Sequence, residues 1–161
     1  MGKGAGKGGG CAGILAAIVS LLEWGVAIAV MVLVGEYMYQ ERVNGVYYAC
    51  LLDGRDGTAN ESICEYAFAL GAFSILASFI VFLVQCATCC CGKIPNIIGT
   101  VFQGMGTIWW LAGAIVIAVY AVPAQGDFPR DSERAAIISL NFGNFVLFLV
   151  GTIASAKEVG D

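Results

Sequence analysis

The sequence predicts an all-α integral membrane protein: a four-helix bundle with a short cytoplasmic hairpin and two extracellular or luminal loops. Of its 161 residues, 59% are hydrophobic and 12% are charged, whereas a soluble domain typically carries about 25% charge. The charged residues cluster between four long apolar runs, and a run of about 18 apolar residues is long enough to cross a bilayer. The strict alternation of a membrane β-barrel is absent from the sequence.

The apolar runs define four helices that we expect to span the membrane. Each is long enough for a hydrocarbon core of about 30 Å at about 1.5 Å rise per residue. The first is too long for the apolar core of a signal peptide, about 7–15 residues, so we expect it to be retained. The predicted organisation is a flexible glycine- and lysine-rich leader (1–10), a membrane domain (11–157) with spans at about 11–38, 66–91, 97–122 and 135–156, and a tail (158–161).

The connections between the spans differ in length. Spans two and three are joined only by "GKIPN" (92–96), which predicts an antiparallel hairpin, with Pro95 placed to begin the next helix. The other two connections are longer and include "YACLLDGRDGTANESICE" and "PAQGDFPRDSER". Because successive spans alternate in direction, both termini and the short hairpin lie on one side of the membrane and the long loops on the other.

Lysine and arginine counts do not decide the orientation, because each side carries four of the 8 basic residues. The side with the long loops also holds Cys50, Cys64 and the glycosylation sequon Asn60-Glu61-Ser62. These features suit an oxidising, luminal or extracellular surface. We therefore predict cytoplasmic termini, a glycan on Asn60, and a location in the plasma membrane or a secretory or vesicle membrane.

Cys50 and Cys64 are the only cysteines on the predicted oxidising side. They flank the turn-rich stretch "DGRDG", and we predict that they form a disulfide. Closing a loop of about 15 residues contributes about 3 kcal/mol to stability in the chain-entropy model.

A second group of cysteines lies in "QCATCCCGK", at the predicted cytoplasmic end of span two. Thiols at a membrane edge are accessible to acyl transfer, so we predict S-acylation of at least one of them. Two alternatives are inert packing as small hydrophobic side chains and metal or redox chemistry. Four cysteines on consecutive helical turns converge poorly on a tetrahedral zinc ion, and the chain has no histidine. The residues concerned are Cys86, Cys89, Cys90 and Cys91.

Glu23 lies about midway through the first predicted span. A carboxylate there costs several kcal/mol unless it is protonated, paired or hydrated, and no lysine, arginine or histidine lies deep in any span. Desolvation therefore favours the neutral acid. Asn144 reaches a similar depth, Gln103 lies somewhat nearer the cytoplasm, and either can form a hydrogen bond with Glu23. Three roles are open for Glu23: a structural link between helices, ion or proton handling, and contact with a partner protein or lipid headgroup.

Small and aromatic residues in the last two spans predict close helix packing. In lipid, helices associate through residues that let their backbones approach. The two tryptophans are central in their span, not at an interfacial belt, so we expect them to pack on nearby glycines. The predicted packing residues are Gly104, Gly106, Trp109, Trp110, Gly113, Gly143 and Gly151.

The stretches "GTIWWLAGAIVIAVYA" and "AAIISLNFGNFVLFLVGTIASA", on a four-span plan with a short hairpin, give the chain a family resemblance. It resembles the MARVEL-type tetraspan proteins, the group that includes synaptophysin-, synaptogyrin- and Casparian-strip-like proteins. The arginine in span one and the aspartate in span three typical of Casparian-strip proteins are absent. The resemblance covers roughly residues 11–157 and implies a role in membrane organisation or vesicle trafficking, without catalysis.

The sequence predicts no catalytic residues, metal or cofactor, because no nucleophile lies beside a base and no intramembrane acid–base pair is present. No basic patch points to nucleic acid. We predict a non-enzymatic protein that organises membrane domains, vesicles or partner proteins by lateral helix association. Its expected partners are membrane lipids and further membrane proteins in a homo- or hetero-oligomer. The alternatives are a proton- or ion-handling subunit that uses Glu23 and an accessory subunit of a larger membrane complex.

Overall fold

Four long helices make up most of the chain in the computed structural model, which describes residues 9–54, 61–91, 94–122 and 130–160. All four are long and apolar enough to cross a membrane. The helices are α1 (Gly9–Tyr37), α2 (Ser62–Cys91), α3 (Ile94–Ala121) and α4 (Asp131–Gly160).

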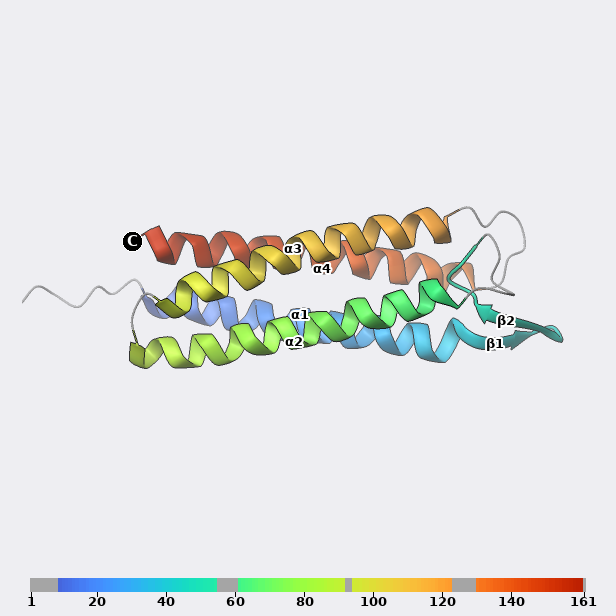
Figure 1. Cartoon of the computed structure of the whole chain (residues 1–161), viewed down its shortest axis with the longest axis horizontal. Coiled ribbons are helices and arrows are strands. Elements are labelled where there is room, and N and C mark those ends of the chain that lie inside the picture. The colour runs from blue at the N-terminus through green and yellow to red at the C-terminus, as the bar shows by residue number, and fades with distance from the viewer. Residues whose placement is uncertain (1–8, 55–60, 92–93, 123–129, 161) are drawn as a thin grey trace, which may run out of the picture.

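The helices alternate in direction along the bundle (Figure 1), and their contacts form a closed ring. α1 packs against α2 and α4, and α3 packs against the same two helices from the opposite side. The start of α1, the end of α2, the start of α3 and the end of α4 lie at one end of the bundle, here called the terminal end. The predicted all-α membrane four-helix bundle is confirmed.

The helices extend beyond the apolar runs of the sequence. α2 begins at Ser62 and α4 at Asp131, each about one turn before the predicted span, and α4 continues to Gly160. Hydropathy detects only the part of a helix that matches the hydrocarbon core, whereas hydrogen bonding continues into polar surroundings. Pro95 is the second residue of α3, where its missing N–H has no helical acceptor to lose.

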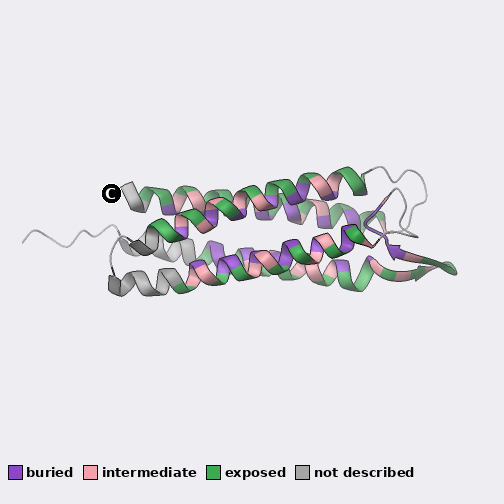
Figure 2. Cartoon of the chain, viewed as in Figure 1, coloured by how far each residue is buried: buried purple, intermediate pink, exposed green. Residues whose placement is uncertain are grey.

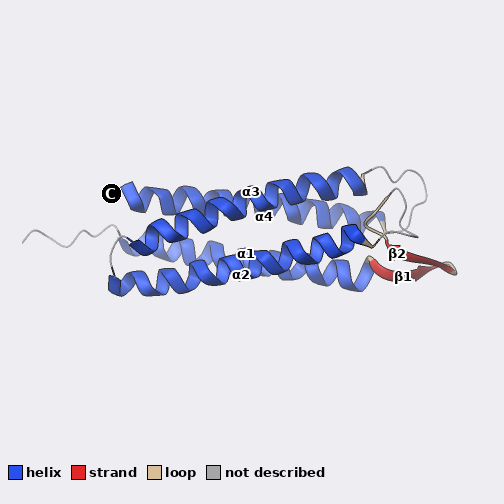
Figure 3. Ribbon diagram, viewed as in Figure 1, coloured by secondary structure: helices blue, strands red, loops and turns tan. Residues whose placement is uncertain are grey.

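A β-hairpin follows α1 at the other end of the bundle, here called the strand end (Figure 3). Strand β1 (Tyr39–Val43) pairs antiparallel with β2 (Val46–Cys50). The two turn residues, Asn44 and Gly45, have φ values of 50° and 84°, as a two-residue type I′ turn requires. We predicted no strand in this loop. The signal was the pair Asn-Gly between two short strand-like runs.

The hairpin is anchored on the strand end of the bundle. The Leu51 amide donates to the Met38 carbonyl oxygen at 2.7 Å, and the Gly54 amide donates to Tyr120 at the end of α3 at 3.0 Å. The side chains of Leu51 and Leu52 are fully buried there. The described part of this loop, up to residue 54, thus packs on the strand end of the bundle.

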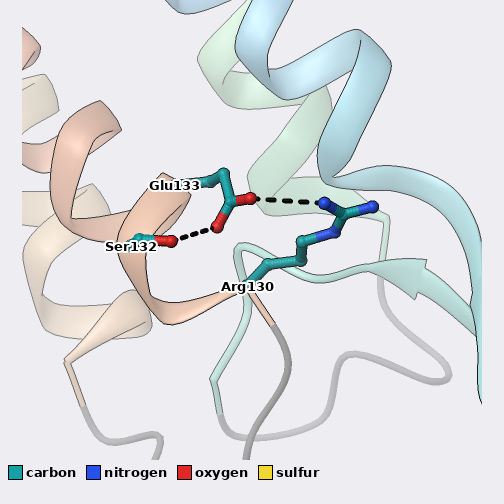
Figure 4. A network of polar contacts seen from close by, with 3 residues as sticks. All are labelled: Arg130, Ser132 and Glu133. Carbon is teal, nitrogen blue, oxygen red and sulfur yellow. Dashed lines mark hydrogen bonds and ion pairs between the residues drawn. The ribbon is translucent and has the colours of Figure 1, made fainter.

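A small charged network fixes the start of α4 at the same end (Figure 4). Arg130 forms an ion pair with Glu133 at 3.2 Å, and Ser132 donates a hydrogen bond to the same carboxylate at 2.6 Å. The Arg130 guanidinium also lies over the Tyr37 ring, 5.2 Å from its centre. This contact links α4 to the end of α1.

The distribution of polarity is the reverse of that in a soluble protein. Large apolar side chains are exposed on all four helices, with Ile108 on α3 the most exposed at 72%. Buried and exposed residues alternate along each helix (Figure 2). Polar side chains are buried between the helices: Ser20, Glu23, Ser74, Ser78, Gln103, Asn141, Asn144 and Ser155. Such a surface suits lipid as its solvent.

Candidate functional site

Three helices bring polar side chains together at Glu23, inside the bundle. The Ser78 hydroxyl of α2 donates to Glu23 Oε2 at 2.9 Å, and the Gln103 amide of α3 donates to the same oxygen at 3.4 Å. All three side chains are at most 1% exposed. Gln103 was one of the two partners predicted for Glu23. Ser78 was missed, because a serine in an apolar helix gives no sequence signal of its own.

Asn144 does not contact Glu23. Both of its side-chain polar atoms lack a hydrogen-bond partner within the described part of the chain, although the residue is fully buried. Gln103 lies opposite Gly151, and Asn144 lies about 10 Å from Gly151 along the axis of α4. Asn144 is therefore about two helical turns from the part of α4 that meets Gln103.

Gly151 makes room for Gln103 in the cluster. A Cβ atom added at Gly151 would lie 2.8 Å from Gln103 Oε1 and 2.9 Å from Gln103 Cδ, closer than van der Waals contact allows. The Gln103 amide thus rests directly on the backbone of α4, and α4 supports the contact that α1, α2 and α3 share.

Two other predicted glycines also lie at close helix contacts. An added Cβ at Gly113 would lie 2.5 Å from Leu70 of α2, and one at Gly106 would overlap the ring of Phe148 on α4. Leu70 and Phe148 are both fully buried. The absence of a side chain at these two positions lets α3 approach its neighbours.

Gly143 has a different environment from the one predicted. It is exposed, and an added Cβ would meet nothing within 4 Å among the described residues. Asn144, the next residue in the chain, lies on the inner face of α4, and Gly143 lies on a different side of the helix. Gly104 is intermediate, with only Thr152 Cγ2 at 4.0 Å. The prediction of close packing was wrong for Gly143.

The two central tryptophans both contact side chains of α2. The Trp110 indole donates to the Ser74 hydroxyl at 3.0 Å. Trp109 packs against Phe73, with ring centres 4.8 Å apart. Trp110 is fully buried. Its partner Ser74 lies one helical turn along α2 from Ser78, the residue that bonds Glu23. The packing of these tryptophans on the neighbouring glycines stays a prediction.

Cys50 and Cys64 meet at the strand end, where the structure joins them in a disulfide with a Cα–Cα distance of 5.8 Å. The bridge connects the end of β2 to the first turn of α2. Nearby, the Tyr39 hydroxyl donates to Glu61 at 3.2 Å. This bond to a carboxylate is the main reason that the pKa of Tyr39 is raised above its usual value.

Several predicted modification sites lie outside the described residues. Asn60 and most of the stretch "DGRDG" belong to residues 55–60, and the leader belongs to residues 1–8. The backbone of α2 includes the cysteine cluster, but its side chains lie outside the described part. Among the described residues, no group of three histidine, cysteine, aspartate or glutamate side chains is placed to hold a metal ion.

The family of the chain follows from comparison with known proteins. A family model, MARVEL, described as a membrane-associating domain, matches residues 13–154. The chain belongs to the MARVEL family. No curated protein and no solved structure matches it. The family resemblance predicted from the four spans and the two stretches of spans three and four is confirmed.

Proposed function

We propose that this MARVEL protein organises membrane domains, vesicles or partner proteins by lateral association of its helices, without catalysing a reaction. The family assignment supports a membrane-associating role. The observation that carries the proposal further is the exposed apolar surface on all four helices of a bundle whose polar groups face inward. Such a surface offers contacts only to lipid and to other membrane-spanning helices.

The proposal is tested by measuring association in lipid. The purified protein is labelled with donor and acceptor dyes and reconstituted in vesicles. Energy transfer between the dyes should stay above the level expected for randomly distributed molecules when added lipid dilutes the protein in the membrane. Chains that co-purify from native membranes in mild detergent would identify hetero-association or an accessory-subunit role. A monomer in vesicles that also brings down no membrane protein would contradict the proposal.

A second function, proton or ion handling, is favoured by one observation, the carboxyl group of Glu23 inside the bundle. If Glu23 only links helices, Glu23→Gln should preserve assembly, because the amide keeps the shape and the hydrogen-bonding capacity. Glu23→Leu leaves Gln103 and Ser78 without their acceptor and should cost about 0.6–2 kcal/mol. If Glu23 carries protons, both variants should be equally damaging, because an amide does not titrate.

Ion and proton flux into reconstituted vesicles separates the two functions, with assembly of each variant measured in parallel. We expect no flux from the wild type. If the wild type shows flux that disappears in Glu23→Gln while the bundle stays assembled, the result would contradict lateral organisation as the function and support ion handling.

We propose cytoplasmic termini and S-acylation of the cysteine cluster. In a cell with a glycosylating secretory pathway, Asn60 should carry a glycan that is lost in Asn60→Gln. Acyl-exchange labelling should report a modification that disappears when Cys86, Cys89, Cys90 and Cys91 are replaced by serine. Terminal tags that are accessible from outside intact cells would contradict the orientation, and bound zinc lost in the same serine variant would contradict acylation.

A further inference from the structure

Hydrogen-bond donors and acceptors do not balance around Glu23. Its Oε2 atom accepts two hydrogen bonds, from Ser78 and Gln103. Glu23 Oε1, Gln103 Oε1 and Ser20 Oγ are buried and have no hydrogen-bond partner among the described residues. Ionised carboxylate oxygens and amide carbonyl oxygens only accept hydrogen bonds. With an ionised Glu23, the cluster would contain acceptors that lack a donor.

The charge of an ionised Glu23 would also lack a partner in the described bundle. α3 contains no charged residue. On α2 the charged residue is Glu65, about 20 Å along the helix from Ser78, and on α1 Glu36 is equally distant from Glu23. On α4 the nearest charged side chain that the structure describes is Lys157, which is exposed and lies about 9 Å from Gly151 along the helix axis. The other charged groups of α4 with described side chains, Asp131, Glu133 and Arg134, lie at its opposite end.

A single proton on Glu23 supplies the missing hydrogen-bond donor and removes the charge that lacks a partner. We propose that Glu23 is an intramembrane proton-binding site, with the proton on Oε1 and with Oε2 as the carbonyl oxygen. The neutral acid needs no counter-ion, and its O–H group supplies the donor that Gln103 Oε1 lacks. Because Oε2 already accepts two hydrogen bonds, it is the oxygen that does not carry the proton. A metal cation would instead have to exchange its hydration shell for three unpartnered oxygens.

The bound proton is then part of the contact between three helices, a property that goes beyond lateral organisation of the membrane. Losing it would leave a negative charge among buried side chains with no cation beside it, which is costly in a medium of low dielectric constant. Gly151 supports the same arrangement from α4 by holding the Gln103 amide in place.

Infrared spectroscopy of the full chain in lipid tests the site directly. The difference spectrum between the wild type and Glu23→Gln should contain the C=O band of a protonated carboxylic acid at neutral pH. Hydrogen bonds to a carbonyl oxygen lower its stretching frequency. The band should therefore shift to higher frequency in Ser78→Ala and in Gln103→Leu, because each variant removes one donor to Oε2.

Ser74→Ala is the matched control, because Ser74 is a buried serine one turn away on α2 that bonds Trp110 and not Glu23. We expect its carboxylic-acid band to match the wild type. A carboxylate band for Glu23 at neutral pH would overturn the proposal. An acid band that gives way to a carboxylate band when sodium or potassium replaces a bulky organic cation would overturn it as well, in favour of a metal-cation site.

Discussion

Gly106→Ala should destabilise the bundle by about 1–3 kcal/mol, the usual cost of adding a methyl group to a filled interior. The added Cβ would overlap two ring atoms of Phe148 and lie 3.1 Å from a third. A ring is rigid, and Phe148 is fully buried, so it has no free space to enter. Relief requires α3 and α4 to separate, which would also weaken the hydrogen bond between Thr107 and Thr152 at 3.0 Å.

Gly143→Ala is the matched control for this experiment. It places the same methyl group on α4, in a helix interior, where nothing lies within 4 Å among the described residues. Alanine is the better helix former, so this variant should be neutral or slightly stabilised. Thermal or denaturant unfolding of both variants in the same detergent measures the difference. Equal stability of the two variants would show that α3 and α4 do not approach each other at Gly106.

Loss of the Cys50–Cys64 bridge should cost about 3 kcal/mol, the chain-entropy value for a loop of this length. The bridge fixes the end of β2 to the start of α2, and both cysteines are fully buried. In Cys50→Ser the hairpin should separate from the strand end of the bundle. A non-reducing digest of the wild type should contain the linked peptide pair, with a mass two hydrogens below that of the separate peptides.

The double variant Cys50→Ser/Cys64→Ser provides the control. When two residues act through one bond, removing either costs as much as removing both. The two single variants and the double variant should therefore have the same stability, and reducing agent should lower the wild type to their level. Costs that add, or equal labelling of both cysteines by a thiol reagent in the unreduced native protein, would rule out the bridge.

The number of helices and their alternating direction could be predicted from the sequence. Each apolar run is long enough to cross the membrane, where a single run can pair its backbone N–H and C=O groups only as a helix. The short connection at residues 92–96 permits only an antiparallel hairpin. The four-span plan with its short hairpin, together with the two stretches in spans three and four, was also sufficient to predict the family. These features depend on residues that are close together in the chain.

Which side of each helix faces inward could not be predicted from the sequence and follows from the packing of the four helices. The sequence does not distinguish Gly106 from Gly143, yet Gly106 lies against Phe148 and Gly143 is exposed. Likewise Gln103 reaches Glu23 and Asn144 does not. All-round apolar helices carry little amphipathic pattern, because lipid accepts the same side chains as the interior. Rotation and register of the helices are therefore set by contacts between residues far apart in sequence.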